Sequence, residues 1–223
     1  MKTESFEFNT AGGPSKAFVA LPEQGAEGSK AVILIHEWWG LAYHIEDIAR
    51  RYAGDGFICV APDLYRGKAT DDPQEASQLM HALKIEDGLD TIKNAMDKAR
   101  ELYGVAHFGI TGFCMGGTFA LRAACELEGI SAAVPFYGDI PDEEILKKLT
   151  APTVFISGTR DQWINTEKVA ALEDATERFE LPLQSIKYDA DHAFFNDTRP
   201  EVFNPDAAKD AYATAVNFFN NNL

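Results

Sequence analysis

The chain has 223 residues, of which 46% are hydrophobic, and this composition suits a single globular domain spanning residues 1–223 with a sizeable core. Its formal net charge of −15 disfavours nucleic acid and anionic membranes as partners, because both require a basic surface. No apolar run approaches the length of a membrane span, and the polar N-terminus lacks the apolar core of a secretory signal, so we expect a cytoplasmic protein.

The cysteines and histidines argue against a disulfide framework and against a metal site. Cys59, Cys114 and Cys125 make an odd count without paired spacing, which is typical of a reducing compartment. Cys59 lies in an apolar strand-like segment and Cys125 in a predicted helix, so both are interpreted as packing residues. The five histidines are scattered and show no metal-ligand spacing, so no metal is expected.

The first half of the chain begins with a predicted hairpin, formed by strands 6–10 and 16–21 around a Gly-Gly-Pro turn at 12–14. Apolar strands and helical patterns alternate after it. The predicted elements are strand 31–36, helix 45–53, strand 57–61, and one or two helices within 74–103 with a break near Asp87-Gly88.

The second half repeats this alternation more regularly. Continuous apolar strands between helices predict an α/β fold, with a mostly parallel central sheet of about eight strands and helices on both faces. No internal repeat or linker divides the chain. The predicted elements are strand 107–111, helix 117–127, strand 130–137, helix 143–149, strand 153–157, helix 167–179, strand 183–188 and helix 205–219.

The most informative motif is residues 112–117, which read Gly-Phe-Cys-Met-Gly-Gly. They fit the nucleophile-elbow pattern Gly-x-Nuc-x-Gly, in which a sharp turn between a strand and a helix exposes the nucleophile. The predicted strand before the motif and helix after it supply that context. Cys114 then lies at a helix N-terminus, whose partial positive charge favours the thiolate. By itself, the motif also fits a buried structural cysteine before a glycine-rich turn.

Further chemistry-bearing residues follow other strands. In a parallel sheet covered by helices, functional groups gather at the carboxyl ends of the strands. Asp161 follows strand 153–157, and His192 follows strand 183–188. Taken singly, Asp161 also fits a turn or helix-cap aspartate, and His192 a surface-loop histidine. Together with Cys114 they stand in the order Cys, Asp, His that the hydrolase elbow fold requires, so we predict a catalytic triad.

This triad predicts acyl chemistry. Cys114 attacks an ester-like carbonyl as a thiolate, and His192 takes and returns the proton. Asp161 fixes the imidazole tautomer and stabilises its cation. The tetrahedral intermediate needs preorganised donors for its oxyanion. We expect these donors to be the N–H of Met115 in the elbow and the N–H of Trp38 in the loop after the central strand.

Nearly the whole chain resembles the dienelactone hydrolase (carboxymethylenebutenolidase) family of α/β-hydrolases. The resemblance implies the Cys114, Asp161 and His192 triad, no cofactor, and hydrolysis of an enol-lactone, in which dienelactone becomes maleylacetate. It also implies that Glu37 is the carboxylate beside the resting thiol, displaced when substrate binds, although a loop carboxylate facing solvent fits this position too. The resemblance rests on residues 36–40 (His-Glu-Trp-Trp-Gly), 61–65 (Ala-Pro-Asp-Leu-Tyr), 112–117, Gly158 with Asp161, and 191–194 (Asp-His-Ala-Phe).

The strand ends also supply candidates for substrate binding. We expect Trp39 to line the pocket, although the Trp38-Trp39 pair also fits plain packing at a sheet edge. Tyr65 and Tyr137 each follow the apolar part of a strand and are further candidates. Asp63 is interpreted as a residue that ties down its loop.

The sequence departs from the family in the cations that hold the substrate. Well-studied members place one arginine four residues after the triad histidine, where this chain has Asn196, and another before the first long helix, where residues 71–75 contain none. Another cation must take this role if the substrate is anionic. Arg66, just past a strand's carboxyl end, is the first candidate for substrate binding. The others are Lys68, Arg160 and Arg199.

Three alternatives stay open at this point. The first is a hydrolase for neutral esters, thioesters or other lactones on the same scaffold, which the missing arginines favour. The second is a non-catalytic ligand-binding relative. The third is an amidotransferase-like or redox protein with a cysteine on a strand-helix elbow, and the lack of a Cys-x-x-Cys pair argues against it. The expected partner is a small-molecule lactone or ester, and the expected state is a monomer or weak homodimer.

Overall fold

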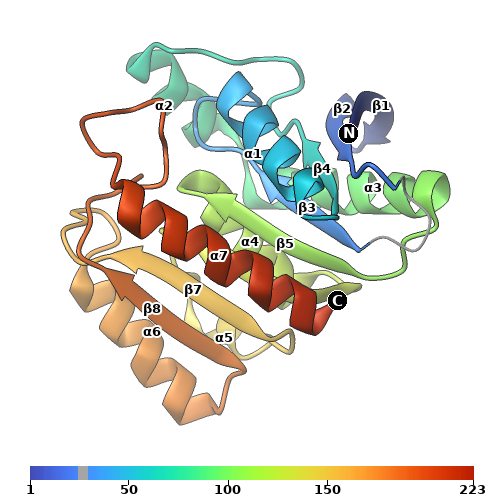
Figure 1. Cartoon of the computed structure of the whole chain (residues 1–223). Helices are drawn as coiled ribbons and strands as arrows, with labels where there is room; N and C mark the ends of the chain where they lie inside the picture. The colour runs from blue at the N-terminus through green and yellow to red at the C-terminus, as the bar shows by residue number, and fades with distance from the viewer. Residues whose placement is uncertain (25–29) are drawn as a thin grey trace.

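The computed structural model describes residues 1–24 and 30–223. Within these residues, eight strands form one sheet in the order β1-β2-β4-β3-β5-β6-β7-β8 (Figure 1). All neighbours from β4 to β8 pair in parallel, whereas β2 pairs antiparallel with both β1 and β4. The strands are β1 (Lys2–Thr10), β2 (Gly13–Leu21), β3 (Ala31–Ile35), β4 (Ile58–Pro62), β5 (Phe108–Phe113), β6 (Ile130–Phe136), β7 (Thr153–Gly158) and β8 (Leu183–Tyr188).

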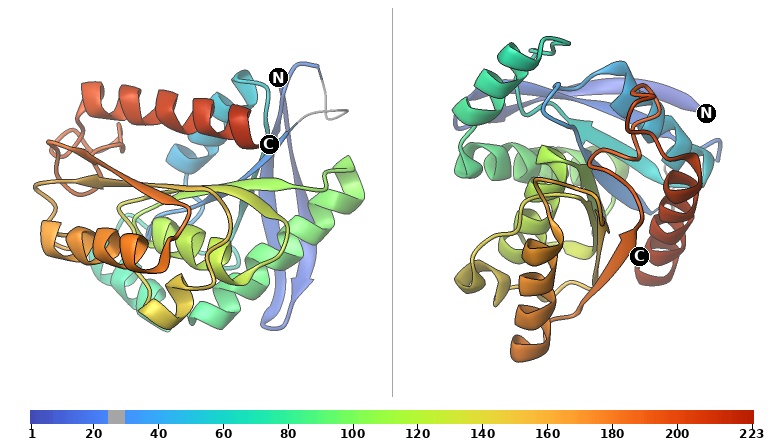
Figure 2. Two further views of the ribbon diagram at one scale, coloured as in Figure 1. Left: turned by 90° about the horizontal axis from the view of Figure 1, so that it is seen from below. Right: turned by 90° about the vertical axis from the view of Figure 1, so that its left-hand side faces the viewer.

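Helices cover both faces of the sheet, and the hydrophobic core is accordingly split into two clusters. Side chains of α1 and α7 belong to the cluster on one face, and those of α3, α4 and α6 to the cluster on the other (Figure 2). The prediction of a mostly parallel sheet of about eight strands with helices on both faces is therefore confirmed. The helices are α1 (Tyr43–Gly54), α2 (Pro73–Ala82), α3 (Ile85–Tyr103), α4 (Met115–Glu126), α5 (Glu143–Leu146), α6 (Thr166–Phe179) and α7 (Pro205–Asn222).

The predicted N-terminal hairpin is present, and its strands are longer than the sequence pattern suggested. They pair from Lys2 opposite Leu21 to Thr10 opposite Gly13. Gly13 takes a positive φ of 117°, a conformation that glycine adopts without steric cost. The extra residues at the start of β1 are polar and mostly exposed, so they carry no hydrophobic pattern by which a strand could be recognised.

The break in the long helical region lies elsewhere than predicted. Leu83 and Lys84 are extended and separate α2 from α3, whereas the expected break at Asp87-Gly88 lies within α3. Gly88 serves packing instead: a Cβ at this position would collide with the ring of Phe119 on α4. A glycine read as a helix breaker is thus a site of close helix-helix approach.

The sheet brings the functional loops to one edge. Every residue of β3, β4, β5 and β7 is buried, as expected for parallel strands covered on both faces. Because these strands are parallel, the loops that follow them leave from the same edge. None of the helices within residues 1–24 and 30–223 combines the length and hydropathy that a membrane crossing needs.

Candidate active site

Cys114 forms the sharp turn between β5 and α4. Its φ of 56° and ψ of −117° are unusual for a residue with a side chain, and it is the N-cap residue of α4. Glycines make this turn possible. A Cβ on Gly112 would collide with the backbone of Gly116, and a Cβ on Gly116 with the backbone at the end of β3. The predicted elbow at residues 112–117 is thus present in the structure.

The thiol of Cys114 is neutral at rest. Burial and the nearby negative charge of Glu37 raise its pKa to about 12, while the backbone N–H of Met115 acts in the opposite direction. The N–H of Met115, at the first turn of α4, therefore faces the sulfur. The other two cysteines, Cys59 and Cys125, are buried in the hydrophobic core, as predicted.

His192 lies in the loop after β8, and Asp161 holds its imidazole. Its Nδ1 is 2.6 Å from Oδ2 of Asp161. The rings of Trp163 and Tyr137 pack against it, with centroids 4.7 Å and 5.1 Å away. Its Nε2 is buried and has no hydrogen-bond partner among the described residues. Because a carboxylate only accepts, Nδ1 carries the hydrogen, and Nε2 of the neutral ring remains a free acceptor.

Asp161 is buried, and two kinds of donor satisfy it. Oδ1 accepts the backbone N–H groups of Trp163 and Ile164, at 2.8 Å and 2.9 Å, and Oδ2 faces His192. Burial by itself would raise the pKa of this carboxyl, but the hydrogen bond and charge of His192 and the two backbone donors outweigh burial, so the pKa is lowered. The carboxylate therefore stays ionised beside the imidazole.

Glu37 follows β3 and is only 3% exposed. Asn196 Nδ2 donates to its Oε2 over 2.7 Å. The carbonyl Oδ1 of the same Asn196 accepts from the N–H and hydroxyl of Thr198, at 3.0 Å and 2.6 Å, which fixes the orientation of the amide. Burial raises the pKa of Glu37 to about 7, against the opposing effects of Asn196 and the positive charge of Arg199. The alternative of a solvent-facing loop carboxylate is therefore wrong.

His36, the residue before Glu37, has a structural role that the sequence did not reveal. Its Nε2 accepts the N–H of Leu64 over 3.1 Å, and its Nδ1 lies 2.6 Å from the carbonyl oxygen of Glu37. A ring that accepts at Nε2 and donates at Nδ1 is a neutral tautomer, and full burial lowers its pKa. The His36 ring thus ties the loop after β3 to the loop after β4.

These side chains meet in a cavity of about 400 Å³. Eight of the predicted candidates line it: Glu37, Trp38, Trp39, Cys114, Met115, Tyr137, His192 and Arg199. Asp161 lies behind His192. Several lining residues were not predicted from the sequence; they come from the α2–α3 region, from α4, from the loop after β6, and from the loop and helix after β7. They are Met80, Leu83, Ile85, Thr118, Phe119, Asp139, Trp163, Ile164 and Lys168.

Two predicted substrate-binding residues do not line the cavity. Tyr65 is buried, and its hydroxyl contacts the Met115 sulfur at 3.1 Å, so it packs against the first residue after the elbow cysteine. Arg66 has a positive φ of 53°, and its guanidinium reaches the N-terminal hairpin, where it lies 3.4 Å from the hydroxyl of Thr10. The turn directs Arg66 away from the site, so the expectation that it binds substrate is not supported by this geometry. Asp63 ties down the loop as predicted, by accepting the N–H groups of Tyr65 and Gly67.

The cations that do line the cavity are Lys168 and Arg199. Lys168 pairs with Asp139 at 2.7 Å, and Arg199 pairs with Glu201 at 2.7 Å. Arg160, another predicted candidate, pairs at the surface with Asp189 and Asp191. Among the described residues, no three His, Cys, Asp or Glu side chains gather as a candidate metal site.

A thiol on a strand-helix elbow, with a His-Asp pair at the carboxyl edge of a mostly parallel sheet, is the arrangement of an α/β-hydrolase. Comparisons with known proteins agree. A family model described as "Dienelactone hydrolase family" matches residues 15–223. "Protein usf" of Aquifex pyrophilus is 32% identical over 96% of both chains. The "Putative carboxymethylenebutenolidase" of Aquifex aeolicus is 31% identical, also over 96% of both chains.

A solved structure extends this likeness to three dimensions. The "Putative Dienelactone Hydrolase" from Klebsiella pneumoniae superposes with a TM-score of 0.90 over 99% of both chains, at 26% identity. The chain therefore belongs to the dienelactone hydrolase family and is a hydrolase with the α/β-hydrolase fold. The family resemblance and the fold class predicted from the sequence are confirmed.

Proposed function

We propose that this protein hydrolyses a lactone or ester bond through a thioacyl intermediate on Cys114. One observation carries the proposal. His192 lines the same cavity as Cys114 and is held at Nδ1 by a buried, ionised Asp161, while its Nε2 has no partner among the described residues. A histidine arranged in this way moves protons between a nucleophile and a leaving group.

The acylation half of the cycle begins with proton transfer from Cys114 to His192. As the Cys114 sulfur bonds to the carbonyl carbon, its proton passes to Nε2 of His192, and the carbonyl electron pair moves onto the oxygen. The N–H groups of Met115 and Trp38 are the proposed donors to that oxyanion. The intermediate collapses, the C–O bond breaks, and the proton on His192 passes to the leaving alkoxide. In a lactone this alkoxide stays attached to the acyl group.

Deacylation repeats these steps with water. Nε2 of His192 takes a proton from water as the hydroxide bonds to the thioester carbon. The C–S bond then breaks, and the proton on His192 returns to the sulfur, which restores the neutral thiol and releases the acid. Asp161 stabilises the imidazolium in both halves of the cycle.

Glu37 sets the resting state in this proposal. Its negative charge is one reason why the pKa of Cys114 is raised, so the thiol is protected from stray electrophiles and oxidants between turnovers. A substrate that enters the cavity and displaces the carboxylate removes that charge. We propose that this displacement allows proton transfer from Cys114 to His192.

The charges around the cavity favour a neutral substrate. Lys168 and Arg199 are both paired with carboxylates, at Asp139 and Glu201, so neither offers an unpaired positive charge to an anionic substrate. The position four residues after His192 is Asn196, whose side-chain amide donates a hydrogen bond to Glu37. These contacts support neutral esters and lactones over an anionic dienelactone as substrates.

A turnover screen tests this function directly. Wild-type protein is assayed with matched neutral and carboxylate-bearing enol esters and lactones, with Cys114→Ala as the inactive control. We expect turnover that Cys114→Ala loses by several orders of magnitude, and a higher kcat/KM for neutral substrates. Absence of turnover with every activated ester would support a non-catalytic relative instead. A preference for the anionic substrate that Arg199→Gln removes and Arg66→Gln keeps would place the anion at Arg199.

A further inference from the structure

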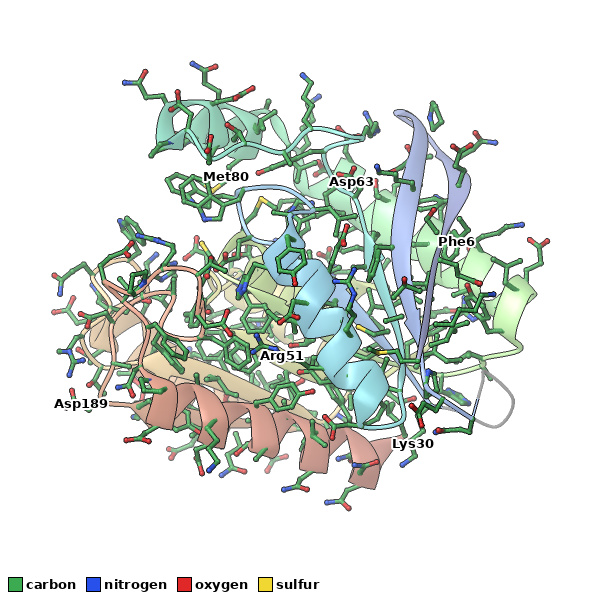
Figure 3. All side chains as sticks on the ribbon, turned by 45° about the horizontal axis from the view of Figure 1, so that its top comes forward. Phe6, Lys30, Arg51, Asp63, Met80 and Asp189 are labelled. Carbon is green, nitrogen blue, oxygen red and sulfur yellow. The ribbon has the colours of Figure 1, made fainter. Side chains whose placement is uncertain are left out.

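The active-site cavity has an apolar wall at the junction of α2 and α3. Met80, Leu83 and Ile85 line the cavity there, and each is only half-buried. Figure 3 shows Met80 on the side of α2 that faces the rest of the molecule. We call these three residues the junction wall. Their side chains carry no charge and no strong hydrogen-bonding group, so the wall favours contact with hydrocarbon.

Other apolar side chains extend this surface inside the cavity. Phe119 of α4 and Ile164, in the loop after β7, are buried and line it, and the ring of Trp163 lies beside His192. Phe119 also packs against Gly88 of α3, which places it next to the junction wall. Apolar side chains therefore surround one part of the cavity that Cys114 and His192 also line.

The cavity is larger than a small lactone ring requires. A cavity of roughly 150 Å³ holds a benzene molecule. The cavity here measures about 400 Å³. A lactone ring placed over Cys114 leaves room for several further carbon atoms. Because the two cations of the cavity are paired, that room is best filled by apolar groups.

We infer that the substrates are neutral lactones or esters that carry an apolar arm of several carbons, and that the junction wall binds this arm. The inference rests on the proposed function, because it assigns the substrate class of the same site. Each buried methylene contributes about three- to fourfold in affinity. The expected signature is a dissociation constant that falls with arm length and then levels off once the cavity is full.

The tryptophans of the chain provide the measurement. All three, Trp38, Trp39 and Trp163, line the cavity, so tryptophan fluorescence responds to its occupancy. Cys114→Ala protein is titrated with δ-lactones that carry unbranched alkyl arms of increasing length. We expect the dissociation constant to fall about three- to fourfold per methylene over the first several members of the series. Equal affinity for short and long arms would overturn the inference.

Variants locate the effect at the wall. Met80→Gln and Leu83→Gln, in the Cys114→Ala background, should flatten the dependence on arm length. Leu79→Gln is the matched control, because Leu79 is a half-buried neighbour on α2 that does not line the cavity. Met80→Phe, which adds bulk without polarity, should shift the optimum to shorter arms. Unchanged dependence in all three wall variants would contradict the assignment. Binding is read without turnover, so wild-type protein that binds long arms but hydrolyses nothing would refute only the proposed function.

Discussion

Two histidines at the carboxyl edge of the sheet, the buried His36 and the half-buried His192, have opposite surroundings. His36, after β3, has both ring nitrogens engaged by main-chain groups of Glu37 and Leu64. His192, after β8, lines the cavity and has one nitrogen held by the Asp161 carboxylate and the other without a hydrogen-bond partner among the described residues. A histidine with two main-chain partners stabilises loops, whereas one with an ionised orienting partner and an open nitrogen can carry protons.

The two loops also differ in charge. Asp161 remains ionised beside His192, because His192 and two backbone N–H groups lower its pKa. Glu37, next to His36, is buried with a pKa of about 7, because desolvation exceeds the help from Asn196. One loop thus provides a fixed negative charge that supports an imidazolium. The other provides a carboxylate whose charge changes near neutral pH, close to the thiol.

Replacing His192 should have the largest effect on activity. Among the described residues, His192 is the one histidine that lines the cavity, so His192→Ala removes the proposed base. We expect kcat to fall by about 10⁴-fold or more. Steady-state kinetics with an activated ester measure the loss, and circular dichroism checks the fold. His107→Ala, at an exposed histidine, is the control. Activity within tenfold of wild type in His192→Ala would place the base elsewhere.

Asp161→Asn should reduce kcat by about 10³- to 10⁴-fold. The asparagine oxygen can keep the N–H groups of Trp163 and Ile164, which leaves its amide nitrogen facing Nδ1 of His192. Nδ1 must then accept, so the ring hydrogen moves to Nε2 and the base is lost. The pH-rate profile measures this effect together with kcat. A variant with wild-type kcat would show that Asp161 is only a loop cap.

His36→Ala should lower stability far more than activity. The change leaves the N–H of Leu64 unpaired and leaves the carbonyl of Glu37 with only the N–H of Gly40 as a donor. We expect the free energy of unfolding to fall by about 1–3 kcal/mol. Urea unfolding measures it, with kcat of the folded fraction staying within about tenfold of wild type. A loss of kcat as large as in His192→Ala, at unchanged stability, would reverse the roles of the two histidines.

The same variant has a pH signature. Burial lowers the pKa of His36 in the folded state. Its stabilising contribution is therefore complete above the unfolded-state pKa of about 6.5 and is lost as the pH falls below it, because only the unfolded chain then takes up the proton. The stability difference between wild type and His36→Ala should be smaller at pH 5 than at pH 7.5. An equal difference at both pH values would mean that this imidazole is not held neutral.

Glu37→Gln should have the smallest effect of the series, on the reactivity of Cys114. It removes a negative charge that raises the pKa of the thiol, so that pKa should fall by about one unit. Iodoacetamide labelling of Cys114 should then be about tenfold faster at pH 8, where wild-type Glu37 is ionised. Asp139→Asn, a cavity carboxylate paired with Lys168, is the control. Equal labelling rates would show that Glu37 does not control the thiol.

Much of this site could be predicted because its determinants are local. The glycines around Cys114 encode a tight turn, and the order of strands and helices places Asp161 and His192 at the same edge as the thiol. The predicted fold class followed from the apolar strands for the same reason. These features depend on backbone conformation and chain order, which the sequence displays directly.

The direction of a side chain depends on contacts between distant segments, and these contacts could not be predicted from the sequence. The positive φ of Arg66 turns its side chain toward the hairpin, although its position past a strand end suggested the site. The bond between Asn196 and Glu37 joins residues 159 positions apart. Met80 lines the cavity near the end of α2 at Ala82, whereas the break in this helical region was expected later because Gly88 looked like a helix breaker.

The most direct test of the proposed mechanism is to locate the acyl group during turnover. Wild-type protein is mixed with saturating 4-nitrophenyl ester, quenched in acid within milliseconds, digested and analysed by mass spectrometry. We predict an acyl group on the peptide that contains Cys114, labile to hydroxylamine, with Cys59 and Cys125 unmodified. An acyl group on another residue, or full turnover by Cys114→Ala with no adduct in the wild type, would contradict the thioacyl mechanism.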